Sequence, residues 1–243
     1  MFRPFKADLH IHTCLSPCTE LDMSPKGILT VAKKKEIDII DICDHNSSEN
    51  SLAVMNAAKE MNINVFPGLE VTSQEEVHVL ALFDEIKNAL KLQDHIYENL
   101  PGENDEEAFG MQVIVNEKEE VLGFNKKLLI GATTIPLEEI IQIIHSFEGI
   151  AIASHIDRGS FSIISQLGFI PDNLELDALE ISPAISLEEA RKRFKNNYPI
   201  ICSSDAHFPD DIGKSFTSFL LKEGTVAEIK KALKNEDGRK LIY

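Results

Sequence analysis

The chain has 243 residues, of which 43% are hydrophobic and 26% charged, which suits one large soluble domain or two small ones. Its formal net charge of −16 disfavours a long nucleic-acid partner, but not a small phosphorylated substrate whose charge divalent cations would offset. No apolar run approaches the roughly 20 residues that span a bilayer, and residues 1–10 lack the apolar core of a secretory signal. We therefore expect a cytoplasmic protein with reduced cysteines and no membrane partner.

Short apolar runs rich in β-branched residues alternate with segments of helical character along the chain. After an N-terminal strand, the predicted strands are 37–43, 64–70, 77–83, 150–155, 178–182 and 199–204. Such alternation of strands and helices is typical of parallel strands with helices outside them. The sequence therefore predicts an α/β fold.

The predicted helices are marked by their capping residues and by their apolar spacing. Ser24 before Pro25 predicts a helix that runs to about residue 36. Apolar residues recur at helical spacing between 137 and 144, which predicts an amphipathic helix. Ser186 and Thr225 each stand three residues before a glutamate, which is the spacing of a capping box.

Residues 84–134 break this alternation. They begin with a polar helical stretch, continue through an acidic segment at 101–107, and end in a hairpin pattern that turns near residues 116–120. Because no repeat or low-complexity linker separates this segment from the rest, we interpret residues 1–243 as a single domain with an inserted helix and hairpin element. We expect the insertion to form a lid or rim.

Potential metal ligands follow the predicted strands, mostly at their C-terminal ends. In α/β barrels this is the face where functional sites are built. Imidazole and carboxylate groups are ligands of Zn²⁺, Mn²⁺ and Fe²⁺, and this many candidates would serve two or three divalent ions. Paired ions suit phosphoester hydrolysis, because they can hold a hydroxide and stabilise both the attacking and leaving oxygens. The candidates are His10, His12, His45, Glu70, His78, His155, Asp205 and His207.

Six motifs in this order, DLHIHT, CDHN, GLE, VHVLAL, ASHIDR and SSDAHF, resemble those of the PHP (polymerase and histidinol phosphatase) family. The resemblance implies a distorted (β/α)7 barrel with two or three metal ions at the C-terminal face of its strands. It also implies a phosphoesterase that uses a metal-bound hydroxide. By this resemblance the first ion is held by His10, His12, Glu70 and Asp205, the second by Glu70, His78 and His155, and the third by His45 and His207.

The chain departs from this family at one position. Many relatives carry an aspartate or histidine a few residues after the first histidine pair, where this sequence reads Ser16-Pro17-Cys18. Cys18 is therefore a candidate ligand that would select a softer ion such as Zn²⁺ or Fe²⁺. Alternatively, the third site is weak. We interpret the remaining cysteines, Cys14, Cys43 and Cys202, as small packing residues.

Other polar residues near the motifs have more than one candidate role. Arg158 is a candidate phosphate ligand because its planar guanidinium matches phosphate oxygens, and the alternative is a salt bridge to Asp157 or Asp172. Asp205 and His207 are candidates for proton transfer as well as ligands. The residues that could support ligands or only stabilise the fold are Asp44 and Glu180; Lys214 is a weaker phosphate candidate, and His95 and His145 are interpreted as surface or boundary residues.

The sequence thus favours a metal-dependent phosphoesterase that acts on a small phosphorylated substrate, either a phosphomonoester or a nucleotide or short oligonucleotide. Four alternatives remain. An amidohydrolase also begins with a histidine pair on its first strand. A nuclease would use the same metals on small oligonucleotides, a regulatory module would bind metals without catalysis, and a histidinol-phosphate phosphatase would need a substrate pocket that the sequence does not identify.

Overall fold

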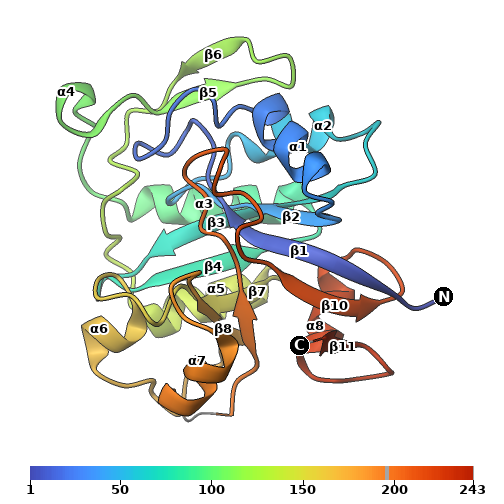
Figure 1. Ribbon diagram of the computed structural model, residues 1–243. Coiled ribbons are helices and arrows are strands. Elements are labelled where there is room, and N and C mark those ends of the chain that lie inside the picture. Colours follow the sequence, from blue (N-terminus) through green and yellow to red (C-terminus); the bar gives the residue numbers. More distant parts are fainter. Residues whose placement is uncertain (195–196, 243) are drawn as a thin grey trace.

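A curled sheet of nine strands dominates the computed structural model, which describes residues 1–194 and 197–242 (Figure 1). Its strand order is β11-β10-β1-β2-β3-β4-β7-β8-β9. Strands β5 (Val113–Val115) and β6 (Val121–Phe124) form a separate hairpin. The nine strands are β1 (Arg3–Ile11), β2 (Ile39–Ile42), β3 (Asn64–Thr72), β4 (His78–Leu82), β7 (Ile150–Ala153), β8 (Ala178–Ile181), β9 (Ile200–Cys202), β10 (Thr217–Leu221) and β11 (Lys240–Ile242).

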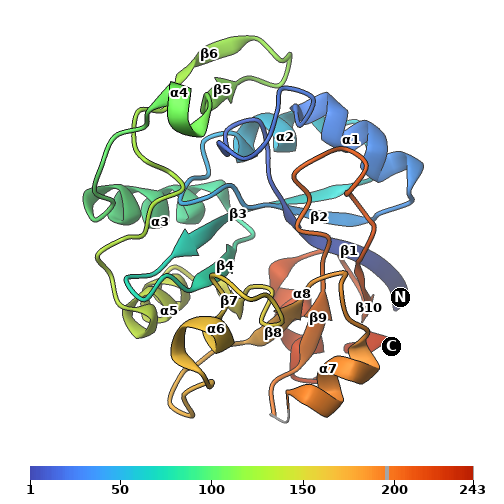
Figure 2. The ribbon, with the colours of Figure 1, turned by 60° about the vertical axis from the view of Figure 1, so that its left-hand side comes forward.

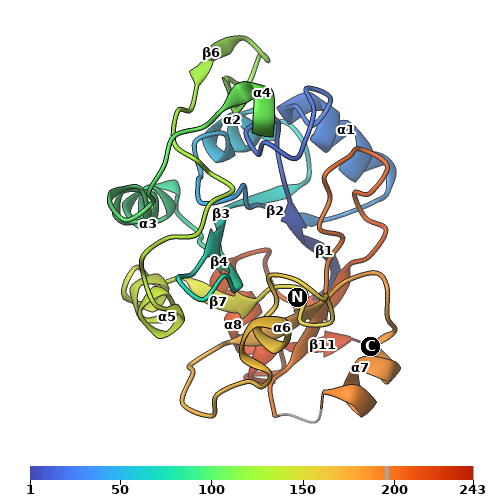
Figure 3. The same ribbon diagram turned by 90° about the vertical axis from the view of Figure 1, so that its left-hand side faces the viewer.

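Helices surround the curved sheet, as the view in Figure 3 shows most clearly. Their apolar faces pack on the outer side of the strands: Ile140, Ile141 and Ile144 of the predicted amphipathic helix are all buried in the core. The α/β fold expected from the sequence is therefore confirmed. The helices are α1 (Pro25–Lys34), α2 (Ser51–Ala57), α3 (Ile86–Glu98), α4 (Glu106–Phe109), α5 (Leu137–Ser146), α6 (Ile163–Leu167), α7 (Leu187–Arg193) and α8 (Val226–Leu233).

The helix starts follow the capping residues. Ser24 accepts a hydrogen bond from the Gly27 amide, and Ser186 accepts one from the Glu189 amide. Thr225 caps α8 in the same way, but Glu228 does not complete a capping box, because its carboxylate instead binds Arg239 and the Lys222 amide. None of the helices in the described residues is long and apolar enough to cross a bilayer.

The sheet is mixed, so the expectation of parallel strands holds for only part of it. Strands β1, β2 and β3 pair in parallel, as do β7, β8 and β9, but β4 is antiparallel to both β3 and β7. The physical reason is the connection of residues 73–77 between β3 and β4, which is too short for a crossover and permits only a hairpin. Strand β10 also runs antiparallel to β1.

Seven neighbouring strands, from β1 through β4 to β7, β8 and β9, form the distorted barrel that the family resemblance implied. The residues after β9 close the barrel at its C-terminal edge, where Ile11 and Ala206 form a parallel bridge. The amide of His12 donates to the Ala206 carbonyl, and the amide of Ala206 donates to the His10 carbonyl. This closure brings the first and the last of the six sequence motifs together.

The segment 84–134 contains α3, α4 and the β5–β6 hairpin. The hairpin lies at the top of both Figure 1 and Figure 2, near α2. Helix α3 buries Ala89, Leu92 and Ile96 in the barrel core. The hairpin is attached by Asn50, whose side chain donates to the Val113 carbonyl and accepts from the Val115 amide. The interpretation of the whole chain as one domain with an insertion stays a prediction.

Candidate metal centre

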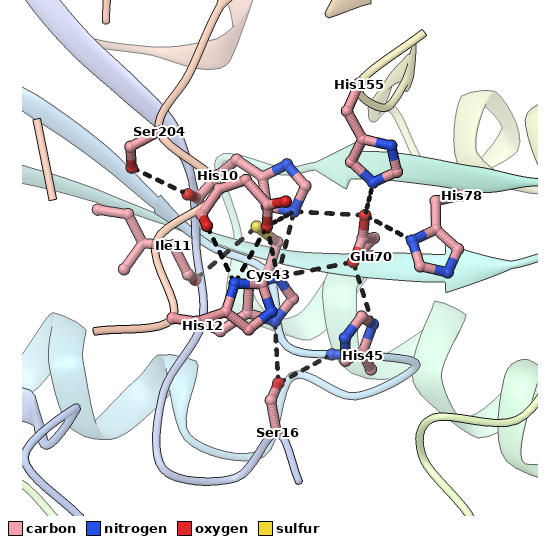
Figure 4. Close-up of polar contacts among 12 residues, drawn as sticks. His10, Ile11, His12, Ser16, Cys43, His45, Glu70, His78, His155 and Ser204 are labelled. Carbon is pink, nitrogen blue, oxygen red and sulfur yellow. Dashed lines mark hydrogen bonds and ion pairs between the residues drawn. The ribbon is translucent and has the colours of Figure 1, made fainter. Parts of the chain in front are cut away.

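Six histidines, Glu70 and Asp205 meet at the C-terminal edge of the barrel, and Figure 4 shows most of these side chains. They come from β1, β3 and β4 and from the segments that follow β1, β2, β7 and β9. Neighbouring imidazole rings in this cluster have centroids 4.3–6.2 Å apart. The structure therefore brings together His10, His12, His45, His78, His155 and His207, all of which the strand-end pattern identified.

Glu70 lies at the centre of the cluster and is almost completely buried. Its Oε1 is 2.9 Å from His78 Nδ1 and 3.1 Å from His155 Nε2. Its Oε2 is 3.0 Å from His45 Nδ1. A carboxylate whose two oxygens face different imidazoles has the geometry of a bridging ligand.

Asp205 faces the first histidine pair. Its Oδ1 lies 3.2 Å from His10 Nε2 and 3.3 Å from His12 Nε2, and these two nitrogens are 3.1 Å apart. The backbone of Asp205 has a φ of 51°, and that of His155 has a φ of 29°. Left-handed conformations of non-glycine residues cost energy and concentrate at functional sites, where the surrounding structure enforces them.

Buried polar residues orient the histidines from outside the cluster. His10 Nδ1 lies 2.9 Å from Glu180 Oε2, and that oxygen also accepts from the amide of His155. The Ser16 hydroxyl donates to Asp44 and lies 3.0 Å from His12 Nδ1. Such partners hold the Nδ1–H tautomer, which leaves each Nε2 lone pair available for a metal.

These supporting contacts answer two questions that the sequence left open. Glu180 supports two of the candidate ligands, and Asp44 acts through Ser16 and also accepts from the Thr13 amide and hydroxyl. Sequence reasoning missed the roles of Ser16 and of Asp8, which accepts hydrogen bonds from the Ser204 amide and hydroxyl. A signal was present for Asp8, since an acidic residue in a buried strand requires a partner.

Burial and mutual contacts shift the acidity of the cluster strongly. Burial alone would raise the pKa of Glu70, but the imidazoles of His78 and His10 hold that pKa well below its ordinary value. Burial opposes a charged His10, yet Asp205 and Glu180 raise the pKa of His10 well above its usual range. Burial and the neighbouring His207 lower the pKa of His12 well below normal.

The donor atoms fit divalent metal ions. Three overlapping groups each have ligand atoms within 4.8 Å of one another. Both carboxylate oxygens of Asp205 and Nδ1 of His45 are buried and make no hydrogen bond, although charged neighbours lie beside them. Buried oxygen and nitrogen atoms that lack hydrogen bonds and point towards a common space are expected at a cation site. The groups are His10, His12 and Asp205; His45, Glu70 and His78; and His12, Cys18, His45 and His207.

A cavity of about 180 Å³ opens over the cluster. Arg158 lines it and forms an ion pair with Asp205 rather than with Asp157 or Asp172, because the Asp157 carboxylate binds the Ser182 amide and hydroxyl. The predicted insertion contributes Ile130 to the wall. Phe161 also lines the cavity, with its ring stacked 4.9 Å from that of His78.

The residues interpreted as lying outside the site do so. His95 and His145 are half-buried in helices α3 and α5, and His145 forms an ion pair with Asp177. The Lys214 ammonium binds Asp211 at the surface. Cys14 and Cys43 are buried and face backbone carbonyl groups, Cys202 is half-buried against the core, and all four cysteines are unpaired.

Two sequence comparisons match parts of the chain. Residues 188–237 match the family model described as PHP-associated. An uncharacterized protein of Methanocaldococcus jannaschii is 34% identical over 100 residues, which cover 37% of this chain and 58% of that protein.

Solved structures share the fold across almost the whole chain. The lesion-specific endonuclease PfuEndoQ of Pyrococcus furiosus has a TM-score of 0.75 at 19% identity, covering 98% of this chain and 58% of that one. Endonuclease Q in complex with a 27-mer duplex containing an abasic lesion gives 0.71 at 20% identity, with the same coverage. A two-domain Bacteroides vulgatus protein with a predicted PHP-like metal-dependent phosphoesterase gives 0.54 at 16% identity, covering 100% of this chain and 65% of that one.

Proposed function

We propose that this chain belongs to the PHP (polymerase and histidinol phosphatase) family and is a metal-dependent phosphoesterase that hydrolyses a small phosphorylated substrate. The observation that carries the proposal is the convergence of three overlapping groups of metal donors at the floor of one open cavity. Glu70 belongs to this floor, and Arg158 stands at its wall. Metal donors and an arginine facing the same small space suit a phosphoryl group.

The ligand assignment follows the contacts. His10, His12 and Asp205 form one donor group, and Glu70 extends it towards His78 and His155 through Oε1. Two or three divalent ions bound here would neutralise charge on the phosphoryl oxygens and supply a nucleophile at neutral pH. The third donor group includes His45 and His207. The identity of these ions as zinc, manganese or iron is part of the proposal.

Arg158 would hold the substrate phosphate. Its side chain is 42% exposed, so the guanidinium can turn from Asp205 towards a ligand in the cavity, and a bound metal ion would then balance the charge of the buried Asp205 carboxylate. The planar guanidinium can then donate two parallel hydrogen bonds to phosphate oxygens.

Proton transfer is assigned to His207 and Asp205. The side chain of His207 is 21% exposed at the cavity rim, whereas that of Asp205 is 3% exposed. Because His207 Nδ1 donates to the Asp205 carbonyl, its Nε2 faces away from that bond. His207 would therefore transfer a proton only while Nε2 is not bound to the third ion, and Asp205 would do so through Oδ2, which faces Arg158 and the cavity.

Cavity size and surface charge support a short substrate. A space of about 180 Å³ accommodates a phosphate with a small attached group, and the stacked Phe161 offers an apolar surface for that group. The net charge of −16 opposes a long polyanion. The substrate class is therefore a phosphomonoester, a nucleotide or a short oligonucleotide.

Cleavage of a phosphodiester in DNA is the second candidate. It is favoured by the two endonuclease Q structures, whose TM-scores are 0.75 and 0.71. This chain spans 58% of those proteins, so the remaining part of each has no counterpart in the alignment.

The test measures phosphate release from phosphomonoesters and cleavage of short oligonucleotides by Mn²⁺-reconstituted protein. We expect turnover on one class, and we expect His155→Ala to lower it by at least about 10²-fold, since its loss removes several kcal/mol of metal-dependent stabilisation. His95→Ala is the matched control, because His95 lies on α3 outside the cluster, and it should retain activity. Bound metals without turnover on any substrate would contradict the proposal and favour an amidohydrolase or a non-catalytic module.

A further inference from the structure

We propose that Cys18 is a thiolate ligand of the third metal ion, so that this site alone selects a thiophilic cation while the two sites around Glu70 take ions that prefer nitrogen and oxygen. This inference rests on the proposed metal centre and specifies one part of it. Its basis is the position of a single side chain relative to three imidazoles. No other thiol of the described residues belongs to any of the donor groups.

The donor geometry suits one ion held by Cys18, His45 and His207, because the single free nitrogen of His12 already serves the first donor group. The Cys18 Sγ and one nitrogen each from His12, His45 and His207 all lie within 4.8 Å of one another. With metal–ligand bonds of about 2.0–2.3 Å, the donors of a tetrahedral site are separated by about 3.3–3.8 Å. A contraction of Cys18, His45 and His207 by less than the length of one bond would therefore enclose an ion and leave its fourth position open.

The nitrogens have their lone pairs available. His207 Nδ1 lies 3.0 Å from the Asp205 carbonyl oxygen, which can only accept, so Nε2 carries the lone pair. The Ser16 hydroxyl donates to Asp44 and therefore accepts from His12 Nδ1, which leaves His12 Nε2 for the first donor group beside Asp205, while His45 Nδ1 lies 3.0 Å from Glu70 Oε2 and leaves His45 Nε2 for the third ion. These contacts set the tautomers that metal binding requires.

A rigid turn presents the thiol to the cluster. The Thr19 amide donates to the Ser16 carbonyl, which closes a β-turn with Pro17 and Cys18 at its centre. Proline favours this position because its ring fixes φ. The Thr19 hydroxyl donates to the carbonyl groups of Thr13 and Ser16, so the turn is held on both sides. Cys18 is half-buried and lines the cavity over the metal cluster.

Cys14 provides a matched control only four residues away. Its thiol is buried against the Val113 carbonyl and the side-chain amide of Asn50, and it does not belong to any of the donor groups. Replacing Cys14 removes one sulfur without altering the metal cluster. Any effect seen only with Cys18 is therefore an effect of sulfur at the site.

The experiment is cobalt titration of the apo-protein, followed by near-ultraviolet absorption and metal analysis. We expect a sulfur-to-cobalt charge-transfer band in the wild-type protein and in Cys14→Ser, and no band in Cys18→Ser, which should also bind one cobalt fewer per chain. Cys18→Asp should recover that cobalt without the band, because a carboxylate is a ligand that lacks sulfur. In a mixture of Cd²⁺ and Mn²⁺, only proteins with Cys18 should retain cadmium after dialysis.

A band that persists in Cys18→Ser, or a wild-type protein that binds three ions without any band, would overturn the assignment. If Cys18→Ser misfolds, Cys18→Asp still decides, since a band in that variant also contradicts sulfur ligation by Cys18. Turnover without a sulfur band would remove this inference and leave the phosphoesterase proposal standing. A sulfur band without turnover would support this inference and contradict the phosphoesterase proposal.

Discussion

The C-terminal edge of the barrel and the β10–α8–β11 unit both bury charged side chains, but they balance these charges differently. In the β10–α8–β11 unit, Arg239 donates from Nε and Nη2 to the Glu228 carboxylate at 2.7–3.1 Å. The Lys222 amide completes the carboxylate's shell at 2.8 Å. Every charge in this contact therefore has a partner within the chain.

At the barrel edge, the imidazole and carboxylate groups that could bind a metal ion converge without a balanced set of ion pairs within the chain. Glu70 is within 3.5 Å of five imidazoles, and Asp205 has Arg158 as its cationic partner at the cavity wall. Burying so many polar groups is costly unless a ligand satisfies them. The comparison teaches that internally balanced charges mark a structural contact, whereas a convergent surplus of donors marks a binding site. Four substitutions test this contrast.

Glu70→Gln should have the largest effect. The substitution keeps the shape of the side chain but removes the charge shared by the donor groups, so we expect at least about 10²–10³-fold lower turnover and loss of bound metal. Turnover and metal content are measured on the same Mn²⁺-reconstituted protein. Glu228→Gln is the matched control in the other region and should keep both. Full activity of Glu70→Gln would remove the distinction between the two regions.

Glu180→Gln should have an intermediate effect. The glutamine can no longer accept with full charge from His10 Nδ1 and the His155 amide, so we expect metal affinity to fall by about 10–100-fold. Competition with a chelator measures the affinity. An unchanged affinity would show that Glu180 stabilises the barrel without supporting the ligands.

Asp41→Asn extends the comparison to a buried carboxyl group that has no hydrogen-bond partner in either region. Asp41 is fully buried, lacks hydrogen bonds and lies against Gly68, where a Cβ would meet its Oδ2 at 2.5 Å. Burial raises the pKa of Asp41 well above its ordinary 3.8. As the pH rises above 3.8, the unfolded chain therefore loses this proton before the folded protein does. The free energy of unfolding of the wild-type protein consequently falls as the pH rises above 3.8.

We accordingly expect Asp41→Asn to raise Tm near neutral pH, with the gain shrinking as the pH falls towards 4. Thermal unfolding at a series of pH values, with metal content held constant, measures the difference. A gain that is the same at every pH would mean that the proton of Asp41 is not involved.

Glu228→Gln should have the smallest effect, confined to stability. The hydrogen bonds from Arg239 lower the pKa of Glu228 to about 2, so the carboxylate contributes stability above its ordinary pKa of 4.5. We expect a modestly lower Tm at neutral pH and a difference that vanishes as the pH falls from 4.5 towards 2. Thermal unfolding provides the measurement, and a difference that grows in acid would contradict the ion pair.

Much of the fold and of the site could be predicted from local sequence pattern. Apolar runs and capping residues located the strands and helices, and the six ordered motifs identified the candidate ligands. The antiparallel direction of β4 was missed, although the connection at 73–77 contained the signal. The ion pair between Arg158 and Asp205 could not be foreseen, because it joins residues 47 positions apart along the chain.

The sequence by itself identified the candidate metal ligands, because imidazole and carboxylate groups placed at strand ends are restricted to few roles. Only the tertiary structure decided how they combine: that Glu70 is central, that Glu180 and Ser16 orient the histidines, and that Cys18 faces three imidazoles. The physical reason is that ligand type is a local property of a side chain. Ligand geometry depends on strand pairing and barrel closure, which join segments far apart in the chain.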